Sequence, residues 1–174
     1  SASHEKWLMH NWSISVEWQF YLLYPLLLAG GARFSRLSAR ALVIGASLVS
    51  LVYAFWLSAS EPGAGFYVLP ARAWELLAGG LVYLYADAPR RWPVAPVWLE
   101  AAGFSLILLA GVWVDMNHWP GPLVVVPVLG AVLVLLANRQ TSIFSAHPVV
   151  QALGRWSYSI YLWHWPLLVA AMYL

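Results

Sequence analysis

Six apolar stretches, separated by short polar segments, constrain the fold of this chain more than any other feature of its sequence. They cover approximately residues 14–32, 41–58, 70–87, 97–114, 122–137 and 156–174. A helix needs about 20 apolar residues to cross the roughly 30 Å of hydrocarbon in a bilayer, and these stretches approach that length. The sequence therefore predicts an all-α, polytopic bundle of about six transmembrane helices.

The composition agrees with a protein that lies in a bilayer. Hydrophobic residues make up 62% of the chain and charged residues only 9%, with a mean hydropathy of +0.71. A soluble domain is typically about half apolar. Twelve tryptophans and nine tyrosines suit the headgroup boundary. The net charge of +2 is too small to indicate a nucleic-acid partner, and the absence of cysteine excludes disulfides and thiolate metal sites.

The stretches show no internal repeat and no linker long enough to separate domains, so we expect one helical membrane unit. The fifth stretch is short and contains Pro127, which predicts either a start nearer Trp119 or a kink. Small residues within the stretches are expected to let helices approach closely. They are Gly79, Gly80, Gly103 and Gly130.

Arginines gather in the segments that follow the first, third and fifth stretches, which helix alternation places on one side. They are Arg33, Arg36 and Arg40, then Arg90 and Arg91, then Arg139 and Arg155. Lys6 and Arg72 are the basic residues of the other side. The positive-inside rule therefore predicts that both ends of the chain are extracytoplasmic. The residues His4, His10, Asp115 and His118 are then expected at that outer face.

Glu17 is an ionisable residue inside the first apolar stretch. An ionised side chain near the centre of a spanning helix costs about 2.5–3.5 kcal/mol on insertion scales, so embedded acids usually face the bundle interior and pair. A capping box needs the acid three residues after the serine, whereas Ser13 and Glu17 are four apart. Either Glu17 is buried with a partner, or the helix starts later and its dipole favours an acid in the first turn.

Arg72 and Glu75 lie three residues apart in "ARAWELLAGG", on one face of the predicted third helix, where they can form an ion pair. The pair either belongs to a functional site or serves only to position its own helix. Because the first and third stretches both enter from the predicted outer side, Glu17 is expected at a similar depth. A single polar cluster of all three residues is compatible with that depth.

Ser157, Tyr161 and His164 recur at positions i, i+4 and i+7 in "GRWSYSIYLWHWPLL" and so share one stripe of the last helix. His164 lies about 12 Å from the start of that predicted helix at 1.5 Å per residue, near mid-membrane depth. A neutral histidine there can exchange protons near physiological pH. Pro166 is expected to distort the backbone. The alternative is that His164 only packs and bonds to a neighbouring helix.

Several other site chemistries find no support in the sequence. It contains no His-x-x-x-His or acid-rich helix pairing for a metal, no glycine-rich phosphate loop and no Gly-x-Ser-x-Gly elbow. His118 and His147 are loop residues for which we expect structural roles. The embedded charges leave three interpretations open. These are an enzyme, a secondary transporter or flippase with an intramembrane Glu/Arg/His relay, and a structural membrane protein whose charges only pair helices.

The segments "HNWSISVEWQFYLLYPLLL", "RAWELLAGG" and "LGRWSYSIYLWHWPLL" carry most of the polar residues discussed above. They resemble, in this order, three signatures of membrane acyltransferase family 3. The first is similar to H-x-W-S-L-x-V-E-x-Q-F-Y, the second to R-x-W-E-L-x-x-G, and the third to S-Y-S-x-Y-L-W-H-W-P. Three motifs in the correct order, touching most of the chain, make this resemblance specific.

The resemblance implies an integral-membrane acyltransferase of the inner or plasma membrane. Such enzymes move an acyl group, commonly acetyl from acetyl-CoA as co-substrate, to a hydroxyl of an extracytoplasmic carbohydrate such as O-antigen, peptidoglycan or exopolysaccharide. No metal is implied. The catalytic candidates carried over from the motifs are His10, Glu17, Arg72, Glu75 and His164. The candidates for substrate binding are Trp12, Ser13, Ser157 and Tyr161.

The resemblance covers only the later part of the family's membrane domain. Family members begin with helices that carry an arginine and a histidine, the favoured catalytic base, and these motifs are not found in this sequence. We therefore expect this polypeptide to be inactive without those N-terminal helices as partners. Branches of the family continue into an extracytoplasmic domain of the SGNH type, and the predicted outward C-terminus is compatible with such a continuation.

Overall fold

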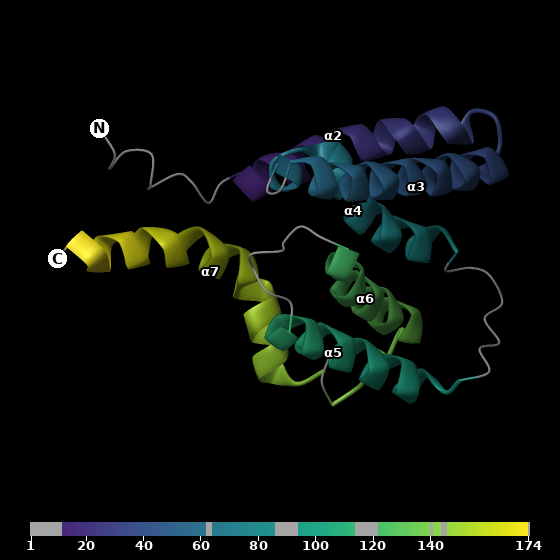
Figure 1. The fold of residues 1–174 in the computed structure, drawn as a ribbon. Helices are drawn as coiled ribbons and strands as arrows, with labels where there is room; N and C mark the ends of the chain where they lie inside the picture. Colours follow the sequence, from purple (N-terminus) through teal and green to yellow (C-terminus); the bar gives the residue numbers. More distant parts are fainter. Residues whose placement is uncertain are drawn as a thin grey trace. The chain divides into compact units, whose positions relative to one another are not determined.

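The computed structural model describes residues 12–61, 64–85, 94–113, 122–139, 141–143 and 146–173. In this part of the chain all regular structure is helical (Figure 1). The α-helices are α2 (Trp12–Ala32), α3 (Arg36–Ser60), α4 (Leu69–Leu84), α5 (Pro96–Trp113), α6 (Val125–Ala137) and α7 (Pro148–Tyr173), with short 3₁₀ helices η2 (Ala64–Phe66) and η4 (Pro122–Val124). The predicted all-α class is confirmed, and each predicted stretch overlaps one of these α-helices.

The chain forms two compact units. The larger unit is Ile14–Asn138, which holds α2 from Ile14 onward together with α3, α4, α5 and α6. The smaller unit is Ser1–Ser13 with Arg139–Leu174, which holds α7.

Two helices of the described residues are long and apolar enough to cross a bilayer. They are Leu37–Ser60, within α3, and Pro96–Trp113, which is α5. Pro122–Ala137 is apolar but shorter. The helix α4 has 16 residues, and at 1.5 Å per residue it is about 24 Å long. The number of about six spanning helices therefore stays a prediction.

The last helix starts earlier than the sequence predicted. α7 begins at Pro148 rather than near residue 156, because Gln151, Gly154 and Arg155 make its first turns less apolar without preventing a helix. Arg155, which we expected in a loop, lies within α7. His164 consequently lies about 24 Å from the start of its helix at 1.5 Å per residue, instead of the predicted 12 Å.

The fifth predicted helix needs no kink. Pro127 lies in the first turn of α6, after the 3₁₀ helix η4, and the first backbone N–H groups of a helix have no intrahelical partner for proline to remove. α6 ends at Ala137, and its C-cap Asn138 adopts a left-handed conformation (φ 45°, ψ 42°) that asparagine tolerates. The alternative start near Trp119 falls outside the described residues.

Side chains from three helices of the larger unit form a hydrophobic core. Phe20 on α2, Val43 on α3 and Leu77 on α4 are its buried members. On α2, Val16 and Phe20 are four residues apart and therefore share one helix face, which is buried. Burying an aliphatic or aromatic side chain of this size stabilises the fold by roughly 1.5–3 kcal/mol. This core fixes which face of each helix points inward.

The start of α3 and the end of α4 lie together. Arg40 donates a hydrogen bond from Nη2 to the carbonyl oxygen of Leu84 at 3.0 Å, and its guanidinium carbon lies 4.8 Å from the centre of the Tyr85 ring. A cation at a helix C-terminus interacts favourably with the helix dipole. The first turns of α3 and the last turn of α4 therefore lie at the same end of this helix pair.

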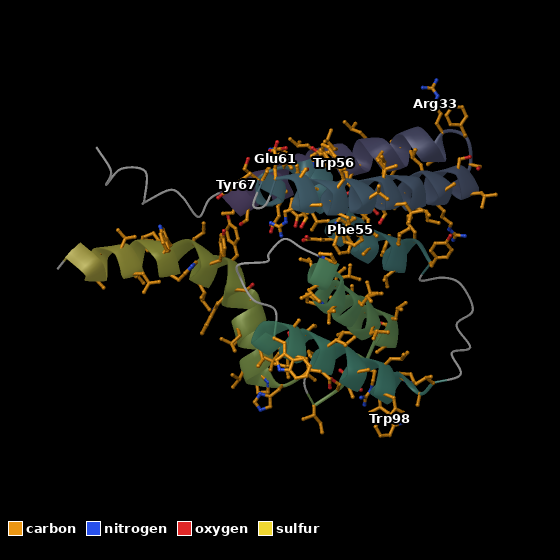
Figure 2. All side chains as sticks on the ribbon, viewed as in Figure 1. Arg33, Phe55, Trp56, Glu61, Tyr67 and Trp98 are labelled. Carbon is orange, nitrogen blue, oxygen red and sulfur yellow. The ribbon has the colours of Figure 1, made fainter. Side chains whose placement is uncertain are left out.

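Large apolar side chains are exposed on the outer faces of the helices. Figure 2 marks Phe55 and Trp56 on α3 and Trp98 on α5, whose exposed fractions are 39%, 61% and 68%. Monomeric soluble proteins seldom expose contiguous apolar patches of this kind, whereas lipid or additional helices would cover them. The exposed surface thus agrees with the apolar composition.

Close approach at glycine is confirmed at three of the four predicted positions. A Cβ atom added at Gly103 on α5 would lie 2.6 Å from the carbonyl oxygen of Gly130 on α6, and one added at Gly130 would lie 2.7 Å from that of Gly103. α5 and α6 therefore pack backbone against backbone here, and Figure 1 shows the two helices side by side. Gly80 contacts Tyr24, whereas nothing lies within 4 Å of a Cβ at Gly79.

Gly80→Ala is expected to lower the free energy of unfolding by about 1 kcal/mol, the low end for overpacking, because one side-chain atom can yield. The new Cβ would lie 2.5 Å from Tyr24 Oη. Tyr24→Phe removes that oxygen, and the hydroxyl is buried with no hydrogen-bond partner among the described residues, so we expect it to restore the melting temperature in detergent. Gly79→Ala is the control. A double variant as unstable as Gly80→Ala would contradict this contact.

Candidate functional site

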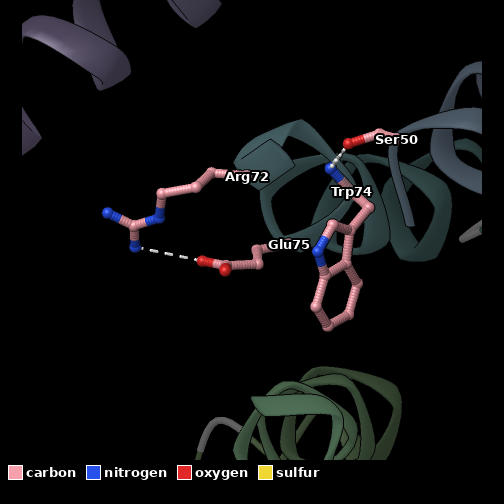
Figure 3. Close-up of polar contacts among 4 residues, drawn as sticks. All are labelled: Ser50, Arg72, Trp74 and Glu75. Atoms are coloured by element: carbon pink, nitrogen blue, oxygen red, sulfur yellow. Dashed lines mark hydrogen bonds and ion pairs between the residues drawn. The ribbon is translucent and has the colours of Figure 1, made fainter. Parts of the chain in front are cut away.

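Arg72 and Glu75 form the predicted ion pair on α4. Arg72 Nη2 lies 3.1 Å from Glu75 Oε2, and the side chains are 25% and 18% exposed (Figure 3). The helix that carries them begins at Leu69, with Pro70 in its first turn. Proline favours a helix start because its fixed φ angle is already helical. The local sequence thus places both charges in the first two turns of α4, three residues apart.

The ion pair and the buried face of α4 point in different directions. Ala71, Trp74 and Leu77 are the buried residues of the helix. Figure 3 shows Arg72 and Glu75 projecting from one side of α4, while Ser50 of α3 approaches the backbone of Trp74 from the other. One side of α4 therefore packs within the larger unit. The other side carries the guanidinium of Arg72, paired with the carboxylate of Glu75.

Glu17 is not in the first turn of its helix. α2 begins at Trp12, so the first turn contains no acidic residue and Glu17 lies in the second turn. The interpretation of Glu17 as an acid that only complements the helix dipole is therefore wrong, because the dipole acts mainly within the first turn.

The predicted cluster of Glu17 with Arg72 and Glu75 does not form either. Glu17 is exposed, and no described residue makes a hydrogen bond or ion pair with its carboxylate. The reason is helical register: the buried face of α2 runs through Val16 and Phe20, and Glu17 is rotated by about 100° from Val16. The arrangement therefore brings together two of the three embedded charges and leaves the third on an open face of α2.

In the smaller unit, two of the predicted substrate-binding residues contact each other. The hydroxyl groups of Ser13 and Tyr161 form a hydrogen bond. Ser157 is exposed, and its hydroxyl donates to the carbonyl oxygen of Gly154 in its own helix at 2.8 Å. The side chain of Trp12 lies outside the described part of the chain.

His164 is oriented by the backbone of its own helix. Its Nδ1 lies 2.6 Å from the carbonyl oxygen of Tyr161, and its ring centre is 5.6 Å from the Tyr161 ring. Since a carbonyl oxygen only accepts, Nδ1 must carry the proton. The neutral imidazole then has its lone pair on Nε2, the atom that can accept a proton.

Of the other predicted polar positions, His147 lies within the described part of the chain. His147 Nδ1 accepts the backbone N–H of Val149 in the first turn of α7 at 3.3 Å, which agrees with a structural role. Four predicted positions lie outside the described residues. These are His4, His10, Asp115 and His118.

Three of the described polar residues that no sequence motif singled out are buried. Glu100 on α5 is 3% exposed, Ser50 on α3 is 6% exposed, and Ser142, which follows α6, is 1% exposed. Glu100 carried the same signal as Glu17, an acid within an apolar stretch, and could have been found by it. Ser50 carried no such signal, because one serine among several in α3 is distinguished only by what packs against it.

Comparisons with known proteins agree on one family for this chain. The acyltransferase domain of acyltransferase family 3 matches residues 2–174. BcsY of Komagataeibacter xylinus, named as a candidate membrane-bound transacylase, is 31% identical over 170 residues, which are 95% of this chain and 42% of that protein. Peptidoglycan O-acetyltransferase OatA of Listeria monocytogenes is 30% identical over 179 residues, 92% of this chain and 29% of that protein.

A third relative agrees with these two. YrhL of Bacillus subtilis, named as a candidate peptidoglycan O-acetyltransferase, is 27% identical over 188 residues, 93% of this chain and 28% of that protein. The chain thus spans less than half of the length of each of these relatives. No solved structure matches it significantly. Since the family match covers nearly every residue, the chain belongs to acyltransferase family 3.

Proposed function

We propose that this chain is part of an integral-membrane enzyme that transfers an acyl group, acetyl in the simplest case, from acyl-CoA to a hydroxyl of an extracytoplasmic carbohydrate. Peptidoglycan, O-antigen and exopolysaccharide are the acceptor classes. The family match over residues 2–174 carries the proposal, because similar proteins are named as a membrane-bound transacylase and a peptidoglycan O-acetyltransferase. The ion pair on α4 also supports the proposal, because Glu75 holds the positively charged Arg72 side chain in place.

The chemistry assigns roles to the described residues. A base removes the proton of the sugar hydroxyl, the oxygen attacks the thioester carbonyl, and the coenzyme leaves as a thiol after the tetrahedral intermediate collapses. Arg72 stabilises the negative charge that develops on the thioester oxygen, and Glu75 orients Arg72 through the observed ion pair. His164, with its proton on Nδ1, accepts or relays a proton at Nε2.

The other motif residues are assigned to the acceptor. His10 and Trp12 bind the carbohydrate on this proposal, together with the hydrogen-bonded hydroxyl groups of Ser13 and Tyr161. Ser157, whose hydroxyl donates to the carbonyl oxygen of Gly154 in its own helix, lines the same substrate path on this proposal.

We further propose that about six helices of this chain span the inner or plasma membrane, with both ends outside, and that additional helices of the full-length protein complete the bundle. Two features support additional helices. Glu17, Ser15 and Gln19 are exposed on α2, where hydrocarbon would penalise them. The chain also covers only 42% of BcsY and 29% of OatA.

Glu17→Gln in the full-length protein tests the enzymatic proposal. On this proposal Glu17 orients a catalytic histidine, so we expect acetyl transfer to fall at least about 100-fold, the scale of a lost acid–base or electrostatic group. Membrane abundance should not change, because no described residue depends on this carboxylate for an ion pair. Mass spectrometry of O-acetyl groups on surface glycans and immunoblotting of membranes provide the two measurements.

Glu61→Gln is the matched control, since Glu61 is exposed at the end of α3 (Figure 2). Normal glycan acetylation by the Glu17→Gln protein would remove Glu17 from the mechanism. Reduced abundance with unchanged transfer per molecule would support the structural interpretation instead.

A further inference from the structure

Ser50 on α3 makes a pair of hydrogen bonds to the backbone of α4. Its hydroxyl donates to the carbonyl oxygen of Pro70 at 2.6 Å and accepts the backbone N–H of Trp74 at 2.9 Å. The side chain is 6% exposed, and Trp74 is also buried. The hydrogen bond to Trp74 is therefore shielded from water and the one to Pro70 is partly buried, which strengthens them and makes their loss costly.

The two groups that Ser50 contacts are four residues apart. In a regular α-helix the N–H of residue i bonds to the carbonyl oxygen of residue i−4, so Pro70 and Trp74 are natural partners of each other. The Ser50 hydroxyl bridges this pair of groups from a different helix. Insertion of a side chain at this point of the hydrogen-bond ladder is a known cause of altered local helix geometry.

The bridged turn is the one that carries the charges. Arg72 lies between Pro70 and Trp74, and Glu75 follows directly. Pro70 has a fixed φ angle, so the start of the turn has little freedom and the hydroxyl determines how the rest of it closes. Figure 3 shows Ser50 on one side of α4 and the ion pair on the other. A change in this turn therefore reorients Arg72 without touching its side chain.

We propose that Ser50 is a positioning residue for acyl transfer: by bridging Pro70 and Trp74 it sets the geometry of the first turns of α4 and thereby the direction of the Arg72–Glu75 ion pair. This inference rests on the proposed function of that pair. It assigns to α3 a role in the reaction that no motif of the sequence indicates.

Ser50→Ala and Ser50→Thr in the full-length protein are the test, measured as acetyl transfer per molecule of membrane protein. Ser50→Ala is expected to lower this rate about 10-fold, since displacement of a catalytic group by a fraction of an ångström is enough. Ser50→Thr keeps the hydroxyl and should transfer at close to the wild-type rate. Ser60→Ala is the matched control on α3, because the Ser60 hydroxyl bonds only to carbonyl oxygens of its own helix, at 2.9 and 3.4 Å.

A double-mutant cycle shows whether Ser50 acts through the ion pair. Arg72→Lys keeps the charge but loses the planar fork that matches a carboxylate. If Ser50 positions Arg72, the two losses are not additive, because contacting or coupled residues fail additivity. Additive losses, an unchanged rate in Ser50→Ala, or a Ser50→Thr rate as low as that of Ser50→Ala would each overturn the inference. Where Arg72→Lys falls below detection, the Ser50→Thr rescue decides alone.

The outcomes also separate this inference from the proposed function. An unchanged rate in Arg72→Lys and in Arg72→Ala would remove the ion pair from the mechanism and the basis of the inference with it. If Arg72→Ala abolished acetyl transfer while Ser50→Ala transferred at the normal rate, the proposed function would stand and only the role of Ser50 would be rejected.

Discussion

Replacing Arg72 by leucine is expected to remove most acyl transfer and to destabilise α4 at the same time. The guanidinium lies 3.1 Å from the Glu75 carboxylate, and the two side chains are only 25% and 18% exposed. Breaking a buried pair costs about 3–5 kcal/mol and breaking an exposed one about 0–1, so we expect an intermediate loss of about 1–3 kcal/mol. Loss of a cation that stabilises developing charge lowers the rate at least about 100-fold.

The double variant Arg72→Leu/Glu75→Leu separates stability from activity. Replacing both partners of a partly buried pair by apolar residues is often neutral or stabilising, because no charge is left without its partner. We therefore expect the double variant to regain membrane abundance and a normal melting temperature in detergent while acetyl transfer stays lost. A double variant that acetylates surface glycans at a normal rate would show that the ion pair only positions its helix.

Gly103→Ala is expected to lower the free energy of unfolding of the α5–α6 pair by about 1–3 kcal/mol, the range for overpacking a tight contact. The added Cβ would lie 2.6 Å from the carbonyl oxygen of Gly130 and 2.7 Å from a methyl carbon of Val134. A backbone oxygen cannot rotate away, so α5 and α6 must separate. The measurement is the melting temperature of the purified full-length protein in detergent.

Gly111→Ala on the same helix is the matched control, and it should raise the free energy of unfolding instead of lowering it. Nothing lies within 4 Å of a Cβ at Gly111, and alanine is about 1 kcal/mol more favourable than glycine in a helix interior. The crossing at Gly103 would be contradicted if both variants melted at the same temperature or if Gly103→Ala were the more stable of the two.

Helix locations were predictable because they depend on local composition. A run of apolar residues long enough to form a membrane helix is visible without knowledge of its neighbours, and each of the six runs overlaps a helix in the structure. The ends were predicted less well where polar residues continue a helix, as in the first turns of α7 from Pro148. Hydropathy detects where apolar residues stop, whereas a helix stops where its hydrogen bonds can no longer be made.

The glycine contacts were also predictable only in part from the sequence. The presence of small residues predicted that helices approach closely somewhere, which holds for Gly103 with Gly130 and for Gly80 with Tyr24. Nothing distinguished Gly79 from Gly80, although only Gly80 faces another helix. A rotation of one residue, about 100°, decides between a contact and an open face.

Local sequence was enough to specify a helical, strongly apolar chain of a recognisable family and to predict the ion pair of Arg72 with Glu75, because a spacing of three residues on a helix is a local property. The packing of the helices was needed to show that Glu17 stands apart from that pair and that Ser50 of α3 bonds to the backbone of the turn of α4 that carries it. Ser50 and Trp74 are 24 residues apart, and a contact at that separation depends on the rotation and crossing of two packed helices. Those quantities follow from side-chain packing across the whole interface, which no single stretch of the sequence contains.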